Sequence, residues 1–272
     1  MNKQQAIVKK ILPNIKNIIM VASGKGGVGK STVAAGLALS LAMDGHAVGL
    51  LDADIYGPSV PTLFNLHGEQ PSIAEQDGKT VIEPFIKFGI RAMSIGFFIN
   101  PKQAMLWRGP MASNGLQQLL DETNWGQLDY LVIDTPPGTG DIHLSLLQQY
   151  EISGVIIVTT PQKIALDDVQ KAISMFKNEH VSVPVLGIVE NMAWFSPSKH
   201  PKEKYFLFGQ GGGELLSKTF NIPFLAQIPL NEDICSICDG GNLNDLLNDI
   251  AVKNGFDELL KGVTNPATEL VN

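Results

Sequence analysis

The sequence predicts an α/β protein built on a doubly wound, mostly parallel β-sheet. Short apolar runs rich in β-branched residues alternate along the chain with segments that favour helices, which is typical of a sheet covered by helices on both faces. One run, Ile18–Ala22, breaks into a glycine-rich segment and continues as a helix-favouring stretch over Lys30–Met43. Another run ends in an acidic residue, Asp134. Because open parallel sheets bind ligands at the carboxyl ends of their strands, we expect the functional site there.

The expected strands and helices follow from these runs and from the turn-favouring residues between them. The strands are Ile18–Ala22, Ala47–Leu51, Ile90–Ile95, Leu128–Asp134, Gly154–Thr160, Pro184–Glu190 and Phe224–Ile228. The helices are Lys30–Met43, Pro110–Asp121, Asp141–Tyr150, Ile164–Asn178, a segment that opens at Gly211–Gly213, and Asn242–Leu260.

Three segments are expected to be less regular. Pro58 and Pro61 restrict Ile55–Leu66 to a loop with one short helix, because proline interrupts longer helices. Residues 67–89 are polar, contain glycine and proline, and suggest one hairpin. Met192–Phe208 reads as a loop that ends in a short strand.

Length and composition suit one large globular domain. The chain has 272 residues, of which 44% are hydrophobic and 17% charged, as is ordinary for a protein with a sizeable core. We expect a polar lead-in at residues 1–16, a single domain over 17–262 and a loose tail over 263–272.

Charge and hydropathy exclude several classes of partner. The net charge of −7 argues against nucleic-acid binding by phosphate neutralisation. No apolar run approaches the roughly 20 residues of a membrane span, and the N-terminus lacks the apolar core of a signal peptide. Two cysteines make no disulfide framework. We therefore expect a cytoplasmic protein with no nucleic-acid partner and no membrane partner.

The glycine-rich segment matches the phosphate-binding pattern G-x-x-x-x-G-K-[ST] between a strand and a helix. Its backbone N–H groups would surround a polyphosphate at the positive end of the helix. Lys30 would reach the β- and γ-phosphates, and Ser31 would place its hydroxyl on Mg²⁺. A chance glycine-rich turn is the alternative. The candidate nucleotide-binding residues are Gly24, Lys25, Gly26, Gly27, Val28, Gly29, Lys30, Ser31 and Thr32.

Acidic residues at strand ends would complete this site. Asp134 opens the segment D-T-P-P-G-T-G-D and could order a water on Mg²⁺, which prefers oxygen ligands; capping of the following turn is the alternative. The backbone N–H of Gly138, in the same segment, could meet the γ-phosphate. Asp52 and Asp54 form a D-x-D pair whose side chains lie on one side of the strand end.

Lys25 is a second lysine inside the loop, and K-G-G-V-G-K-S-T resembles the deviant P-loop family that includes MinD, ParA, the nitrogenase iron protein and Mrp-type scaffold ATPases. Longer motifs resemble the Mrp-type (ApbC-like) iron–sulfur carrier ATPases over about Asn17 to Leu230. They are D-A-D-I-Y-G-P-S-V-P, W-R-G-P-M, D-T-P-P-G-T-G-D and V-E-N-M-A-W-F. The resemblance implies a P-loop NTPase fold and a cytoplasmic homodimer that binds ATP, hydrolyses it slowly and passes a [4Fe–4S] cluster to apoproteins.

The resemblance also implies roles for individual residues. Lys25 would reach the partner's nucleotide across the dimer, Asp54 would orient the attacking water, and Asp52 would lie near the Mg²⁺ shell. The segment that Asp134 opens would be the second switch, with Asp141 as its last acid.

On the base side, Asn191 would pair with the adenine edge, and Pro229 would lie on the other side of the base. Asn191 as an ordinary turn residue is the alternative.

The cysteines depart from the family pattern. A C-x-x-C pair that usually follows N-M-x-x-F is replaced here by F-S-P-S-K-H over 195–200. Cys235 and Cys238 form the only C-x-x-C, so two subunits would again supply four thiolates to a bridging cluster. Packing or redox chemistry of these two cysteines is the open alternative. His200 is interpreted as a solvated histidine rather than a ligand.

Other functions remain open at this level. A MinD- or ParA-like switch would dimerise on ATP without a cluster, and so would an assembly factor that has lost its cluster. The C-terminal segment lacks the basic amphipathic helix of a MinD-like membrane anchor. No cysteine lies between Asp134 and Tyr150, where nitrogenase-type iron proteins place one.

Overall fold

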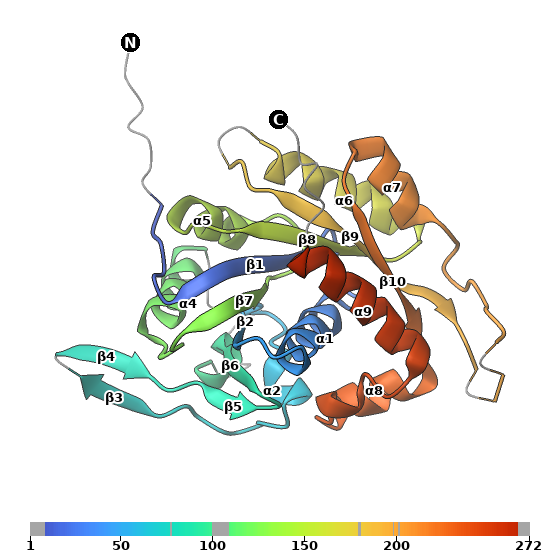
Figure 1. Ribbon diagram of the computed structural model, residues 1–272. Helices are drawn as coiled ribbons and strands as arrows, with labels where there is room; N and C mark the ends of the chain where they lie inside the picture. Colours follow the sequence, from blue (N-terminus) through green and yellow to red (C-terminus); the bar gives the residue numbers. More distant parts are fainter. Residues whose placement is uncertain are drawn as a thin grey trace, which may run out of the picture.

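The computed structural model describes residues 9–76, 78–99, 109–178, 181–197, 199–200 and 202–265. An eight-stranded sheet in the order β10-β9-β8-β1-β7-β2-β6-β5 crosses the described part of the molecule (Figure 1). Its strands are β1 (Ile15–Ser23), β2 (Val48–Asp52), β5 (Phe85–Lys87), β6 (Ile90–Ser94), β7 (Leu128–Asp134), β8 (Gly154–Thr159), β9 (Val185–Phe195) and β10 (Phe224–Leu230). All pairs are parallel except β5 with β6, so the expected doubly wound, mostly parallel sheet is confirmed.

Helices cover both faces of this sheet. They are α1 (Lys30–Met43), α2 (Val60–Leu63), α4 (Gly109–Glu122), α5 (Asp141–Gln149), α6 (Lys163–Phe176), α7 (Gly212–Phe220), α8 (Glu232–Asp239) and α9 (Ile250–Thr264), with 3₁₀ turns at Ile95–Phe97 and Leu243–Asp245. Helices α1 and α9 pack together on one face, and α5, α6 and α7 lie on the other (Figure 1). Gly36 permits the close approach of α1 and α9, because a Cβ there would lie 2.2 Å from the Phe256 ring.

The central strands form the core and fix the position of the site. β1, β7 and β8 are almost entirely buried and consist mainly of Ile, Val and Leu, as a strand covered on both faces requires. β7 lies between β1 and β2, in a register that pairs Asp134 with Val21 on one side and with Asp52 on the other. The carboxyl ends of β1, β2 and β7 therefore bring the glycine loop and both acidic motifs to one edge of the sheet.

Most expected elements are confirmed. The helix Lys30–Met43 and the strand Leu128–Asp134 have the predicted bounds, and the hairpin expected within 67–89 is β3 (Ile73–Gln76) with β4 (Lys79–Ile82). The short helix expected within Ile55–Leu66 is α2. The first two residues of the motif W-R-G-P-M, 107 and 108, lie outside the described residues.

The loop predicted over Met192–Phe208 is wrong at its start, because β9 continues to Phe195. Met192 has a positive φ of 54° inside this strand, and the pairing with β10 shifts register beyond it. Phe195 then bridges Tyr205 in antiparallel fashion. This irregular backbone at Met192 interrupts the alternation of side chains along β9, and the predicted strand therefore stopped at Glu190.

The helix predicted over Asn242–Leu260 is wrong at its start, because a 3₁₀ turn occupies Leu243–Asp245 and α9 begins only at Ile250. Helix α8, which precedes this range, was not predicted. Both α8 and α9 begin at a side-chain cap. Asn231 Oδ1 accepts from the N–H of Asp233 at 2.6 Å, and Asp249 Oδ1 accepts from Ala251 and Val252. β1 begins before the expected domain limit at 17, and α9 ends after the limit at 262. Among the described residues, no helix has the length and hydropathy needed to cross a membrane.

Candidate nucleotide-binding site

The glycine loop leaves the end of β1 and leads directly into α1. Gly27 and Gly29 have φ values of 81° and 77°, which side chains other than glycine rarely adopt. At Gly29 a Cβ would also lie 2.2 Å from Asn191 Nδ2. The loop borders a cavity of about 310 Å³ lined by Ser23, Lys25, Gly26, Gly27, Gly29, Lys30, Ser31, Thr32, Asp54, Gly57, Ser59 and Pro137. The structure thus brings the predicted phosphate-binding residues and Asp54 together around one cavity.

Part of this lining was not predicted from the sequence. Ser23, Gly57, Ser59 and Pro137 border the cavity beside the predicted residues. Each lies within a few residues of a predicted one, so proximity to the motifs was the only signal that could have identified them.

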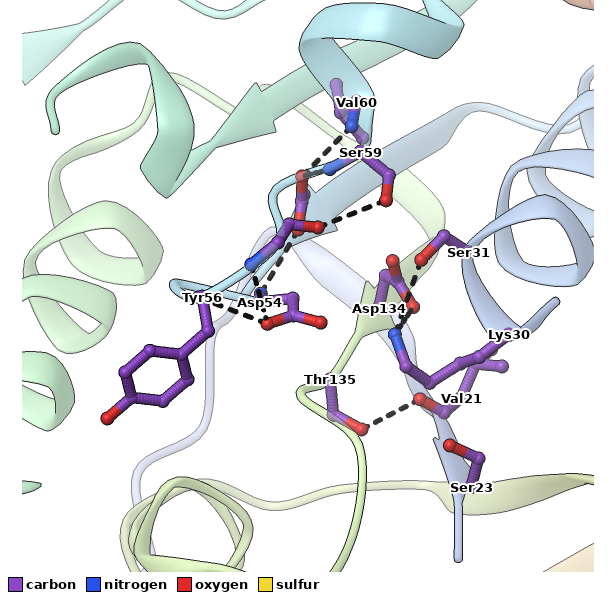
Figure 2. A network of polar contacts seen from close by, with 12 residues as sticks. Val21, Ser23, Lys30, Ser31, Asp54, Tyr56, Ser59, Val60, Asp134 and Thr135 are labelled. Atoms are coloured by element: carbon purple, nitrogen blue, oxygen red, sulfur yellow. Dashed lines mark hydrogen bonds and ion pairs between the residues drawn. The ribbon is translucent and has the colours of Figure 1, made fainter. Parts of the chain in front are cut away.

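A buried ion pair lies at the centre of the site (Figure 2). Lys30 Nζ is 2.5 Å from Asp134 Oδ1, and the two side chains are 6% and 2% exposed. Lys30 Nζ also donates to the Ser31 hydroxyl at 3.4 Å. Asp134 Oδ2 is buried and has no hydrogen-bond partner among the described residues. Burial raises the pKa of Asp134, and the Lys30 charge acts in the opposite direction.

Asp52 is fully buried and organises the loop that follows β2. Its Oδ2 accepts from the Ser59 and Val60 N–H groups at 2.8 and 3.0 Å and from the Ser94 hydroxyl at 2.9 Å. Its Oδ1 accepts from the Asp54 N–H at 3.1 Å. Burial and the neighbouring Asp134 charge raise the pKa of Asp52 to about 7. Any contact of Asp52 with the Mg²⁺ shell would have to share oxygens that already hold this loop.

Asp54, in the loop that follows β2, and Lys25, in the glycine loop, both line the cavity. Asp54 is 8% exposed, and its Oδ1 accepts from the Tyr56 and Gly57 N–H groups, both at 3.2 Å (Figure 2). Lys25 is partly exposed, and its Nζ is 3.4 Å from Gln162 Oε1. The lysine predicted to act across a dimer therefore lies at the border of the cavity within its own chain.

The segment between β7 and α5 is tied back to β1. The Thr135 hydroxyl donates to the Val21 carbonyl at 2.9 Å (Figure 2), and the Gly138 N–H donates to the Ser23 carbonyl at 2.9 Å. Gly138 has a φ of 87°. Its N–H, predicted to meet the γ-phosphate, is thus engaged within the chain, and contact with a phosphate would require this bond to break.

His143 is a residue of this region that sequence reasoning missed. It is fully buried on α5, and its Nε2 lies 2.9 Å from the Thr135 hydroxyl oxygen. Since that hydroxyl donates to Val21, Nε2 is the protonated nitrogen that donates to it. Burial lowers the pKa of His143 to about 4, with the Lys30 charge acting in the same direction, so the ring stays neutral near pH 7. Asp141 begins α5 and is exposed.

The base-side candidates lie beside the loop. Asn191 Nδ2 donates to the Val28 carbonyl at 2.9 Å. Asn191 and Pro229 line one small cavity of about 50 Å³, together with Thr32, Val33, Ile234 and Phe256 among others. The two residues predicted to lie on either side of the base are therefore brought together.

A buried carboxylate that sequence reasoning missed precedes Asn191. Glu190 Oε2 accepts from the Gly213 N–H at 2.6 Å, and its Oε1 accepts from Gln227 Nε2 at 2.8 Å. These bonds join β9 to the start of α7 and to β10, so Glu190 fixes the backbone from which Asn191 extends.

The two cysteines lie on α8 and differ in exposure. Cys235 is exposed and donates to Asp239 Oδ2 at 3.4 Å, which raises the pKa of its thiol. Cys238 is buried, its Sγ is 4.0 Å from the Thr32 hydroxyl oxygen, and burial raises the pKa of its thiol. Within the described ranges, no group of three or more His, Cys, Asp or Glu side chains is arranged to hold a metal ion. His200 is exposed and faces Glu203 at 3.6 Å.

Comparisons with known proteins agree with this geometry. The family model described as ParA: NUBPL iron-transfer P-loop NTPase matches residues 14–264. The iron-sulfur cluster carrier protein of Synechocystis sp. is 50% identical over 216 residues, which are 79% of this chain and 61% of that protein. The protein of the same name from Escherichia coli (strain K12) is 50% identical over 227 residues, 84% of this chain and 60% of its own. The chain thus spans about three fifths of the length of these curated relatives.

Solved structures show the same fold. A nucleotide-binding protein of Archaeoglobus fulgidus in complex with ADP is 38% identical, with a TM-score of 0.76 over 90% of this chain and 93% of that one. MinD of Pyrococcus horikoshii, complexed with Mg-ADP, has a TM-score of 0.62 over 93% of this chain and 97% of its own. At 19% identity the MinD likeness concerns the fold alone.

Lys30→Met should destabilise the nucleotide-free protein by about 3–5 kcal/mol, because it leaves the buried Asp134 carboxylate unpaired. The double variant Lys30→Met/Asp134→Leu removes both charges and should recover most of this loss. Urea unfolding without nucleotide measures both. Equal stability of Lys30→Met and the parent protein would show that the ion pair contributes nothing to the fold.

Asp52 should give the stability a specific pH dependence. Its pKa is raised from 3.8 to about 7, so between these values the folded state keeps a proton that the unfolded chain releases. The stability contributed by Asp52 is therefore complete below about pH 4 and is lost as pH rises through about 7. Urea unfolding at pH 5 and pH 8 should show the parent protein losing stability relative to Asp52→Asn, by at most about 1.4 kcal/mol per pH unit. A constant difference between the two proteins would contradict the assignment.

Proposed function

The chain belongs to the NUBPL iron-transfer P-loop NTPase family, and from this membership we propose that it is a homodimeric, ATP-hydrolysing carrier of iron–sulfur clusters that delivers them to apoproteins. The observation that carries the proposal is the cavity of about 310 Å³ in which Lys25, Lys30, Ser31 and Asp54 meet. The relatives named iron-sulfur cluster carrier protein support the cargo.

The residues around Asp134 fit a magnesium ion. The Asp134 Oδ2 atom is buried and unpartnered among the described residues, and Ser31, whose hydroxyl bonds to the same Lys30 amine as Asp134, lines the phosphate cavity. Both are oxygen donors of the kind that Mg²⁺ prefers. When bound, the ion would neutralise charge on the phosphate oxygens. Lys30 would release Asp134 Oδ1 and donate instead to the β- and γ-phosphates, so that both Asp134 oxygens become free.

Hydrolysis would rely on positioning and charge rather than on covalent chemistry. Asp54 is held by the Tyr56 and Gly57 N–H groups and by the loop that Asp52 organises, so its carboxylate can orient a water towards the γ-phosphate. Lys25 lies at the cavity border, and in a face-to-face dimer it would donate to the partner's triphosphate. The Gly138 N–H would exchange the Ser23 carbonyl for the γ-phosphate and return after hydrolysis.

We assign the cluster, as cargo, to Cys235 and Cys238 of two subunits. The position where the resembling family has its C-x-x-C pair carries no cysteine, and these two residues are the only thiols in the chain. Cys235 is exposed, whereas Cys238 is buried, so loading requires α8 to shift.

A second function keeps the ATPase and omits the cargo. In it the chain is an ATP-gated dimerisation switch, like MinD or ParA, or an assembly factor. The burial of Cys238 and the raised pKa values of both thiols favour this alternative, because iron ligation requires thiolates.

Asp54→Ala should bind ATP with an affinity close to that of the parent protein and lose turnover by about 10²-fold or more.

Lys25→Ala should also bind ATP, but it should fail to dimerise in the presence of ATP and should therefore lose turnover. Lys171→Ala, an exposed lysine paired with Asp168, is the matched control and should change neither property. Equilibrium nucleotide binding, light scattering and phosphate release measure these effects. Full turnover in Asp54→Ala, or an ATP-dependent dimer in Lys25→Ala, would remove that residue from its role.

Anaerobic reconstitution with iron and sulfide tests the cargo. The parent protein should take up about four iron and four sulfide per dimer, and Cys235→Ser/Cys238→Ser should take up neither while it retains ATPase activity. Unchanged uptake in the double variant would clear both cysteines. A parent protein that hydrolyses ATP but takes up no cluster would favour the cluster-free alternative.

A further inference from the structure

Helix α8 contacts two separate parts of the nucleotide site. Its Ile234 side chain lines the small base-side cavity with Asn191 and Pro229. Its Cys238 thiol lies against Thr32, in the first turn of α1. Two residues beyond α8, Gly241 packs closely against the segment that follows α2, since a Cβ at Gly241 would lie 2.4 Å from Asn65 Cβ. Figure 1 shows α8 beside α2 at the same end of the molecule.

The two thiols of α8 face different surroundings. Cys238 is 8% exposed and is the one buried residue of the helix, whereas Cys235 lies one turn earlier, is exposed and bonds only within α8, to Asp239. A reagent that reaches Cys238 must therefore enter between α8 and α1, and a reagent that reaches Cys235 need not. Cys235 therefore serves as an internal control for the labelling of Cys238.

Thr32 is the residue through which Cys238 and a nucleotide would compete. A threonine hydroxyl has one proton to donate; Thr32 lines the phosphate cavity, and its hydroxyl oxygen lies 4.0 Å from the Cys238 sulfur. A group attached to Cys238 Sγ would occupy the space beside Thr32 and displace α8, whose Ile234 forms a wall of the base-side cavity. Conversely, a nucleotide that fills both cavities would hold α8 against α1 and cover the thiol.

We propose that Cys238 is a thiol-modification site that excludes nucleotide, so that soft electrophiles attached to its sulfur and nucleotides bound to the glycine loop oppose each other. This inference rests on the nucleotide site of the proposed function and is independent of the cluster. Because linkage is reciprocal at equilibrium, nucleotide should disfavour the modified thiol by the same factor by which modification weakens nucleotide binding. Nucleotide should also slow the labelling reaction, because it covers the thiol.

Methyl methanethiosulfonate is a suitable probe because it is small and reversible. The Cys238 thiolate attacks its sulfenyl sulfur, an S–S bond to the methylthio group forms, methanesulfinate leaves, and the thiol proton passes to solvent. Dithiothreitol reverses the reaction and regenerates the thiol. The experiment uses the full chain as Cys235→Ser, which keeps only Cys238, and as Cys238→Ser, which keeps only Cys235. Intact mass follows labelling with and without saturating Mg-ADP.

In Cys235→Ser, Mg-ADP should slow labelling by about tenfold or more, and the labelled protein should bind Mg-ADP about tenfold more weakly. Dithiothreitol should restore that binding, which separates competition from unfolding. In Cys238→Ser, labelling should change less than about twofold. Equal protection of both cysteines, no labelling of Cys238 without nucleotide, or full affinity in the labelled protein would overturn the inference. Because Mg-ADP binding to the unlabelled variants is measured in parallel, failure of the nucleotide site itself would appear separately, as a loss of that binding.

Discussion

The buried pair of Lys30 and Asp134 is the interaction on which the arrangement of the site depends. It joins the first residue of α1 to the last residue of β7, and both side chains are almost completely removed from water. Such a pair is a weak source of stability, because desolvation of the two charges offsets their attraction. Its main effect is to place the amine at the mouth of the glycine loop. Beside it, Asp52 pairs in register with Asp134, so two buried carboxyl groups lie side by side on neighbouring strands. The raised pKa of Asp52 reflects its burial and, to a smaller extent, the neighbouring Asp134 charge.

The same geometry explains how binding could be transmitted. Lys30 donates to Asp134, and the Gly138 N–H donates to the Ser23 carbonyl. Both donors belong to segments that border the phosphate cavity, and each internal acceptor can be exchanged for a phosphate oxygen. Asp134, Thr135 and Gly138 lie on one short connection that His143 attaches to α5. If this connection shifts, α5 should move with it, because the hydrogen bond between the neutral His143 ring and the Thr135 hydroxyl joins the connection to α5.

The sequence was sufficient where one local signal marked each end of an element. Lys30–Met43 was predicted to the residue because glycine precedes it and a polar turn follows it. Helix α8 was missed because eight residues give too short a periodic pattern, and because it follows β10 almost without a gap. β9 was cut short because its backbone takes a positive φ at Met192. In the site, the motif residues were identified, but Glu190 and His143 were not. The Glu190 partner Gln227 is distant in sequence, and His143 bonds to Thr135, whose hydroxyl donates to the distant Val21 carbonyl, so only the fold shows what these buried polar groups hold in place.

The position of the thiols bears on how the proposed cargo site and the nucleotide site would communicate. Coupling between distant sites needs elements with two alternative arrangements, and the evidence for a connecting route is usually indirect. Here Cys238 lies in direct contact with Thr32 of the glycine-loop helix, and the same short helix carries Ile234 into the base-side cavity. No relay through the sheet is required, because one helix carries the proposed cargo residues and also contacts the nucleotide site. Ligands that both need the space around Cys238 must then compete, and the sign of their coupling is negative. An iron–sulfur cargo held on α8 would thus be loaded most easily onto a subunit whose nucleotide has left.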